Sequence, residues 1–261
     1  SLDSLCVYKE IEIASAKPTF EERGDIIHFG IDEVYPNVEF DVIKFIELYK
    51  KAKEYAFKND KNLIIVGGTG FYLKALIDGL SQGIETKIKL DIPQEDAYDL
   101  LYKIDKEYME KIEKNDRYRI EKAYAIYKQT SLGPTQYFQK NPKIAVAKDL
   151  KIFEILWDKE ELKNRILKRT KIMINSGIID EVIFLEKKYT REPNSMSSIG
   201  IIETLEYLDG KLTKQELEEK ISANTAKLAK RQNTFNKGQF LDKTSNIIEN
   251  LNSDIIKYFS L

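Results

Sequence analysis

The fold is decided by one stretch, Asn62-Leu63-Ile64-Ile65-Val66-Gly67-Gly68-Thr69-Gly70-Phe71-Tyr72-Leu73-Lys74-Ala75-Leu76. Its apolar run, 63–66, has the length of one buried strand. Two glycines follow at once, and apolar residues then recur at helical spacing from Phe71. A strand, a glycine turn and a helix start direct backbone N–H groups and a helix dipole towards an anion. The stretch therefore predicts a phosphate-binding turn with the Thr69 hydroxyl beside it, or else a tight turn without a ligand.

The composition is that of a globular protein with room for a large core. The chain has 261 residues, 42% of them hydrophobic, which suits one large domain or one domain with an insertion. Lys and Arg number 42 against 43 Asp and Glu, so the overall charge neither requires nor excludes nucleic-acid binding. Cys6 is the single cysteine, which excludes an intrachain disulfide and favours a cytoplasmic location. No apolar run approaches the roughly 20 residues of a membrane span.

The segments around this stretch predict a parallel α/β core. Residues 1–8 resemble the end of a strand that begins upstream, which would place Asp3 at a carboxyl-terminal strand edge, although a helix N-cap is the alternative. Asp41 is a good N-cap for a helix with apolar residues at helical spacing, and the 63–66 strand follows. Helix, strand and helix in succession are typical of a parallel sheet.

The middle of the chain predicts an all-helical insertion. Apolar residues mark one face of a helix over 95–114 and of another over 116–128, and Gly133-Pro134 breaks the second. A strand pattern over 150–158 returns the chain to the core. We therefore predict a core of 1–82 and 148–261, and an insertion of 83–147.

Two later helices carry basic faces. Arg165 and Arg169 lie four residues apart, and Lys227, Lys230 and Arg231 form a second cluster. Guanidinium groups with a glycine turn suit a di- or triphosphate, and a solvated helix face is the alternative for each cluster. A carboxylate such as Asp3 beside bound phosphate would orient Mg²⁺ through water or take a proton from an attacking amine or hydroxyl.

Several ordered segments together carry a family resemblance, and they span nearly the whole chain. These segments are Asp3-Ser4-Leu5-Cys6-Val7-Tyr8, 12–18 (EIASAKP), 64–75 (IIVGGTGFYLKA), 115–120 (NDRYRI), 162–177, 198–203 (SIGIIE) and 225–234 (TAKLAKRQNT). They resemble the motifs D-S-x-Q-V-Y, D-I-G-T-A-K-P, I-V-G-G-T-x-x-Y-x-K-A, N-D-x-x-R-I, L-x-x-R-I-x-x-R, I-G-Y-x-E and T-R-x-x-A-K-R-Q-x-T of the tRNA dimethylallyltransferase (isopentenyltransferase) family.

The resemblance implies a P-loop NTPase/kinase-like parallel sheet flanked by helices, of the nucleotide- or ATP-binding type, with the insertion gripping the tRNA anticodon arm. The family's G-x-T-x-x-G-K-S loop would lie before Ser1. The implied reaction transfers a dimethylallyl group from dimethylallyl diphosphate to N6 of adenine 37, beside the anticodon. Mg²⁺ would bind the diphosphate, and we assign no metal ligand within this sequence. The implied protein is a cytoplasmic monomer.

The resemblance also implies roles for individual residues. Catalysis falls to Asp3, Thr69 and Arg169, with Asp3 as the general base. Diphosphate binding falls to Gly67, Gly68, Arg165, Arg169, Lys230 and Arg231. Contacts with tRNA fall to Asp3, Ser4, Leu5, Cys6, Thr69, Arg119 and Lys122. Cys6 stands where the family has glutamine and Lys122 where it has arginine, so the RNA contacts depart from the family pattern.

Three other functions remain open from the sequence. A prenyltransferase acting on free AMP would need no grip on an anticodon arm. A P-loop small-molecule kinase would use the same core to bind ATP. An RNA-binding remnant without catalysis would bind tRNA and turn nothing over.

Overall fold

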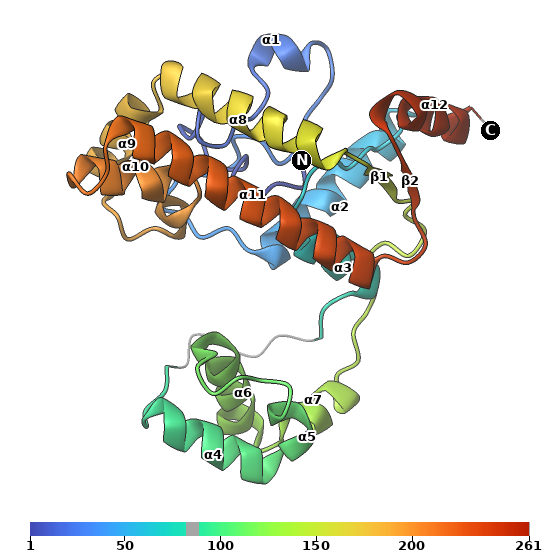
Figure 1. Cartoon of the computed structure of the whole chain (residues 1–261). Coiled ribbons are helices and arrows are strands. Elements are labelled where there is room, and N and C mark those ends of the chain that lie inside the picture. Colours follow the sequence, from blue (N-terminus) through green and yellow to red (C-terminus); the bar gives the residue numbers. More distant parts are fainter. Residues whose placement is uncertain (82–88, 261) are drawn as a thin grey trace. The chain divides into compact units, whose positions relative to one another are not determined.

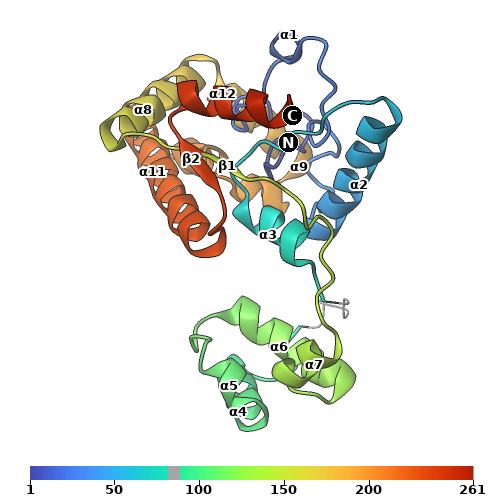
Figure 2. The same cartoon turned by 90° about the vertical axis from the view of Figure 1, so that its right-hand side faces the viewer.

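The computed structural model describes residues 1–81 and 89–260 and divides the chain into two compact units (Figures 1 and 2). One unit joins Ser1–Lys74 to Asp149–Leu261, and the other is Ala75–Lys148. No membrane-spanning helix occurs among the described residues, since none there is both long and apolar enough. From the sequence we predict a catalytic core of 1–82 and 148–261 and a tRNA-binding insertion of 83–147. This division, with the functions it assigns, stays a prediction.

The first unit holds most of the helices and both strands. Its elements are α1 (Phe20–Arg23), α2 (Val42–Lys58), β1 (Phe153–Ile155), α8 (Lys159–Asn175), α9 (Ile178–Tyr189), the 3₁₀ helix η1 (Asn194–Ser197), α10 (Ile201–Leu208), α11 (Lys214–Gln239), β2 (Thr244–Asn246) and α12 (Ile248–Phe259). Helix α3 (Gly70–Asp78) leads from this unit into the second. Helices α8 and α11 pack against each other and lie side by side in both views (Figures 1 and 2).

The sheet is small and parallel. Strands β1 and β2 pair in parallel with Phe153 opposite Thr244, and α12 packs on them, its Tyr258 ring 5.9 Å from that of Phe153 (Figure 2). The α/β class is therefore confirmed, while the P-loop kinase-like arrangement stays a prediction. The strand predicted over 150–158 shrinks to three residues.

The strand predicted over 63–66 is wrong. The run is extended but forms no ladder, and its side chains at Ile64 and Val66 are 56% and 68% exposed. The run contacts Leu2, whose amide donates to the Val66 carbonyl at 2.6 Å. An apolar run becomes a buried strand only when neighbouring backbone pairs with it and covers it, which the run itself does not supply.

The core of the first unit forms around a loop near the start of the chain. Val7 and Ile11 are 1% and 0% exposed, and they pack with apolar residues of α8, α9, α10 and α11. Burying such a side chain stabilises the fold by about 1.5–3 kcal/mol. The loop that begins at Asp3 is therefore anchored in the core by the residues that follow it.

The predicted helix start at Asp41 is confirmed, whereas the single helix predicted over 95–114 is wrong, because it divides at Asp105 into α4 (Gln94–Ile104) and α5 (Lys106–Met109). Asp41 caps α2 by accepting from the Ile43 and Lys44 amides, and Thr213 caps α11 in a capping box with Glu216. The first-turn N–H groups of a helix lack intrahelical partners, which is why such side chains mark helix starts in a sequence.

The second unit is helical among its described residues. Its helices are α4 (Gln94–Ile104), α5 (Lys106–Met109), α6 (Arg117–Thr130) and α7 (Pro134–Lys140). Ala97 and Leu101 of α4 pack on Ile120 and Tyr124 of α6, as the helical spacing predicts. Asp116 caps α6 through the Arg119 amide, and Pro134 opens α7 after the predicted break.

Candidate active site

Asp3 begins a tight turn. Its Oδ1 accepts hydrogen bonds from the backbone amides of Leu5 at 2.7 Å and Cys6 at 3.2 Å. An aspartate that binds amides two and three residues ahead stabilises a turn and loses its own rotational freedom. The alternative helix N-cap is wrong, because the carboxylate binds the amides of a turn and no helix begins there, while the strand edge stays a prediction.

The glycine stretch lies against this turn. The Ser4 amide donates to Thr69 Oγ1 at 3.2 Å, and the Thr69 amide donates to the Leu2 carbonyl at 3.0 Å. Two segments that lie 65 residues apart in the chain therefore meet. The Thr69 hydroxyl and the Asp3 turn form one local structure.

Close packing requires a glycine at Gly67, whereas Gly68 lies against the flexible end of a glutamine side chain. Gly67 has a φ of +153°, and a Cβ atom there would lie 2.4 Å from the Leu2 carbonyl oxygen. A Cβ at Gly68 would lie 2.4 Å from Nε2 of Gln232, which donates to the Gly68 carbonyl at 3.0 Å. The backbone of Leu2 and helix α11 thus occupy the space that the absent side chains leave. Direct diphosphate contacts by Gly67 and Gly68 stay a prediction.

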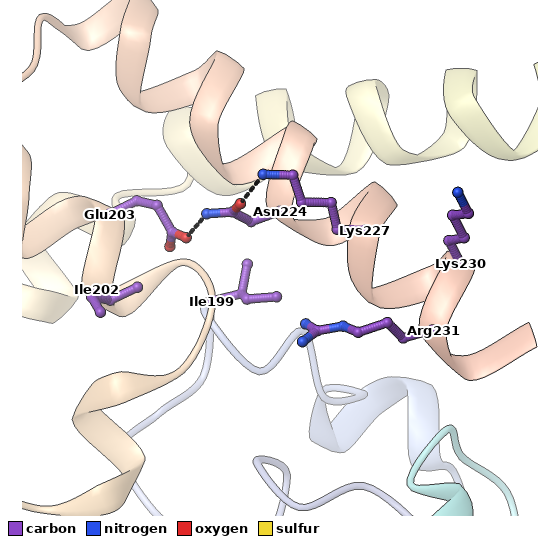
Figure 3. Close-up of a pocket in the computed structure, with 7 residues that line it drawn as sticks. All are labelled: Ile199, Ile202, Glu203, Asn224, Lys227, Lys230 and Arg231. Carbon is purple, nitrogen blue, oxygen red and sulfur yellow. Dashed lines mark hydrogen bonds between the residues drawn. The ribbon is translucent and has the colours of Figure 1, made fainter. Parts of the chain in front are cut away.

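A pocket of about 550 Å³ lies beside the middle of α11 (Figure 3). Apolar residues at the start of α10 and polar or basic residues of both helices line it, namely Ile199, Ile202, Glu203, Asn224, Lys227, Lys230 and Arg231. Lys227 lies one turn before Lys230 and Arg231 on α11, and Arg231 directly precedes Gln232, whose side chain reaches the glycine stretch. Lys230 and Arg231 border this shallow pocket and remain exposed to solvent, so their contact with a ligand stays a prediction.

A hydrogen-bond network supports the pocket wall (Figure 3). The Glu203 side chain is almost fully buried, and its two oxygens accept from the Gly200 amide at 2.6 Å and from Asn224 Nδ2 at 2.7 Å. Lys227 Nζ in turn donates to Asn224 Oδ1 at 3.4 Å. A buried carboxylate needs such donors to offset its desolvation. Asn224 was not predicted as a site residue, because its role depends on the contact between α10 and α11.

The basic residues of α8 lie on its exposed face. The Arg165 guanidinium stacks on the Trp157 ring, 4.2 Å from its centroid, which fixes the side chain. Arg169 is one turn further along the same helix. Within residues 1–81 and 89–260, Arg165, Arg169, Lys230 and Arg231 make no salt bridge. Their positive charges are thus available to an anionic ligand.

The model of the IPP transferase family matches residues 6–239. The chain belongs to this family. It is 80% identical over 261 residues to the tRNA dimethylallyltransferase of Aliarcobacter butzleri (strain RM4018), covering 100% of this chain and 90% of that one. It is 52% identical to the tRNA dimethylallyltransferase of Sulfurimonas denitrificans (strain ATCC 33889 / DSM 1251), covering 98% and 88%.

Solved structures of the family share the fold. The full-length tRNA isopentenylpyrophosphate transferase of Bacillus halodurans matches with a TM-score of 0.71 at 26% identity, over 99% of this chain and 85% of that chain. A eukaryotic dimethylallyltransferase acting on tRNA matches with a TM-score of 0.75 at 27% identity, over 90% of this chain and 62% of that chain.

In this IPP transferase the first residues of the Asp3 turn are more exposed than Cys6 at its end. Ser4 is exposed and Leu5 is half-buried, whereas Cys6 is 7% exposed with its thiol towards the Ser15 carbonyl. Burial, and then the nearby Asp3 carboxylate, raise the pKa of the Cys6 thiol to about 11. The Cys6 side chain therefore faces the interior in this structure, and its predicted contact with tRNA stays a prediction.

The two predicted RNA contacts of the helical unit lie on α6. Arg119 is exposed and pairs with Asp116, its Nη1 lying 3.3 Å from Oδ2. Lys122 Nζ lies 5.3 Å from the centroid of the Tyr118 ring, which is 69% exposed. Basic side chains beside an exposed aromatic ring suit RNA, whose bases stack on such rings.

The described residues do not themselves build a Mg²⁺ site. Among residues 1–81 and 89–260, no group of three His, Cys, Asp or Glu side chains is arranged to hold a metal ion. The cationic side chains of α8 and α11 also disfavour a free divalent cation. Magnesium bound to the diphosphate stays a proposal.

Proposed function

We propose that this chain modifies tRNA by transferring a dimethylallyl group from dimethylallyl diphosphate to N6 of adenine 37, with release of diphosphate. Family membership and 80% identity to a tRNA dimethylallyltransferase support tRNA prenyl transfer as the activity. The observation in the structure that carries the proposal is the hydrogen bond between Ser4 and Thr69. It brings an oriented carboxylate and a hydroxyl together beside a helix rich in positive charge.

Asp3 acts as the general base in this proposal. A bond forms between N6 and the first carbon of the allyl group while the bond from that carbon to the diphosphate oxygen breaks. The N6 proton passes to Asp3 Oδ2, because Oδ1 already accepts two backbone amides. An exocyclic adenine amine is a weak nucleophile, so a fixed carboxylate at its proton lowers the barrier. Thr69 lines the place where the amine and the carbon meet.

The diphosphate is held by positive charge. We assign Arg169, supported by Arg165, and Lys230 with Arg231 to its oxygens, together with backbone amides at Gly67 and Gly68. Charge that develops on the leaving group is stabilised by such fixed donors. Mg²⁺ on the diphosphate would neutralise it further. A P-loop kinase-like arrangement of the core would supply the remaining phosphate contacts.

Each of the two units contributes residues that contact transfer RNA in this proposal. The exposed start of the turn, Asp3 to Leu5 with Thr69, contacts the target nucleotide, and Cys6 belongs to the same segment. Arg119 and Lys122 of the helical unit grip the anticodon arm. Adenine 37 must leave its loop stack to reach Asp3, which is how single-stranded RNA loops are usually read. The protein acts as a cytoplasmic monomer in this proposal.

Incubation of the protein with labelled dimethylallyl diphosphate tests the function. We expect label in an isolated anticodon stem-loop that contains adenine 37, and none when guanine replaces that base. Label in free AMP but not in the stem-loop would favour an adenylate prenyltransferase. Transfer of the γ-phosphate of ATP without prenyl transfer would favour a kinase, and RNA binding without turnover would favour an inactive RNA-binding protein.

A further inference from the structure

A buried lysine lies behind the Asp3 turn without a role in the site described so far. Lys17 belongs to the segment 12–18, and its side chain is 1% exposed. Its ammonium contacts the Asp32 carboxylate, Glu12 Oε1 at 2.9 Å and the backbone carbonyl of Tyr8 at 3.0 Å. Lysine is among the residues least often found buried, and the three oxygen partners of Lys17 offset the cost of burying its charge.

Asp32 extends this contact to a second segment. One of its oxygens accepts from Lys17, and the other accepts from Arg23 Nη2 at 2.9 Å. The backbone amide of Asp32 donates to the Cys6 carbonyl at 3.1 Å. The pair of Lys17 and Asp32 thus holds the carbonyls of both Cys6 and Tyr8.

These carbonyls belong to the turn that Asp3 begins. Asp3 Oδ1 takes the amides of Leu5 and Cys6, and the Tyr8 amide donates to the Leu5 carbonyl at 3.1 Å. The turn is therefore closed at its start by Asp3 and clamped at its end by Lys17 and Asp32. A shift at the clamped end would move the amides that fix the Asp3 carboxylate.

We infer that Lys17, with Asp32, is a positioning residue for prenyl transfer: it holds the far end of the turn that presents Asp3 to the amine. The inference rests on the proposed function, in which Asp3 takes the amine proton. A buried ion pair contributes little net stability compared with apolar residues of the same size, and in some proteins it is retained because it favours one geometry. Lys17 therefore serves the placement of Asp3 more than the stability of the core.

Replacing Lys17 by methionine tests the inference, because methionine keeps the length of the chain and removes its charge. We expect kcat for the anticodon stem-loop to fall on the order of 100-fold, as for a misplacement of about 1 Å. We expect KM for dimethylallyl diphosphate to stay within about threefold, since Lys17 touches no diphosphate ligand. Lys58→Met is the matched control, because Lys58 is exposed and pairs only with Glu54 among the described residues. Its kcat should equal that of the unaltered protein.

A double variant separates positioning from general structural damage. In an Asp3→Asn background, Lys17→Met should lower the single-turnover rate no further, because no base remains to be placed. A fall by the same factor in both backgrounds would overturn the inference, as would a folded Lys17→Met variant with unchanged kcat. Lys17→Arg should recover part of the lost kcat.

If Lys17→Met does not fold, Asp32→Asn takes its place, because asparagine keeps the shape of the clamp. We expect it to lower kcat about tenfold with KM unchanged. An unchanged kcat in folded Asp32→Asn would overturn the inference. Absence of transfer by the unaltered protein would instead overturn the proposed function, so the two failures are distinguishable.

Discussion

Replacing Asp3 by asparagine separates the two tasks of its carboxylate. The amide oxygen can still accept the Leu5 and Cys6 amides, which lie 2.7 and 3.2 Å from Oδ1, so the turn remains. The nitrogen that replaces Oδ2 takes no proton. We expect kcat to fall by about 10²–10⁴, the usual contribution of general base catalysis. Affinity for tRNA should change by less than about tenfold, or ~1.4 kcal/mol.

Replacing Asp3 by alanine removes the acceptor as well. Two backbone amides then lose their partner, at about 1 kcal/mol each, and water repays part of this cost because the site is half exposed. The free energy of unfolding should therefore fall by about 1–2 kcal/mol, while in Asp3→Asn it should change by less than about 0.5 kcal/mol. For a protein of this size, each kcal/mol shifts the melting temperature by roughly 2–4 °C.

Single-turnover transfer of a labelled dimethylallyl group to the anticodon stem-loop measures the catalytic effect, and thermal unfolding measures the stability. Fluorescence anisotropy of a labelled stem-loop measures RNA affinity. Asp25→Asn is a suitable control, because Asp25 is exposed and lies outside the site. A kcat of Asp3→Asn within about threefold of the unaltered protein would refute the assignment of Asp3 as the base.

Three other perturbations test the geometry. Gly67→Ala should lower the free energy of unfolding by about 2–4 kcal/mol in chemical denaturation, because φ is +153° and the new Cβ would lie 2.4 Å from a carbonyl oxygen. Gly238→Ala is the control and should leave the free energy of unfolding unchanged, because a Cβ there would meet nothing within 4 Å. Burial, and then neighbouring negative charge, raise the pKa of Cys6 from 9.0 to about 11. Iodoacetamide at pH 8 should therefore react about a hundredfold more slowly with the native protein than with the urea-unfolded protein. The free energy of unfolding should also fall as the pH rises from 9 to 11, because the thiol of the unfolded chain loses its proton first. A difference in reaction rate below about tenfold would contradict this burial. Arg169→Ala should raise KM for dimethylallyl diphosphate by about tenfold or more and change stem-loop affinity little, as measured by steady-state kinetics and anisotropy, while Lys168→Ala should affect neither.

Local signals in the sequence determined the helices of this protein. Asp41 caps a helix where the pattern predicts, since a helix start needs partners within its own first turn. Apolar spacing likewise located the faces of α4 and α6 that pack together. The ordered motifs were also sufficient for the family, because together they span most of the chain.

Tertiary structure alone decided how the site is built. The apolar run at 63–66 has the pattern of a strand, yet a strand forms only where other backbone pairs with the run. Backbone that meets the run, such as Leu2, is distant in the chain and cannot be inferred from the run itself. The glycines after it accommodate Leu2 and Gln232, which no local pattern shows. Asp3 is held by a turn whose far end rests on Lys17. A sequence reports contacts within one turn of helix, whereas a site is made where distant segments are packed together.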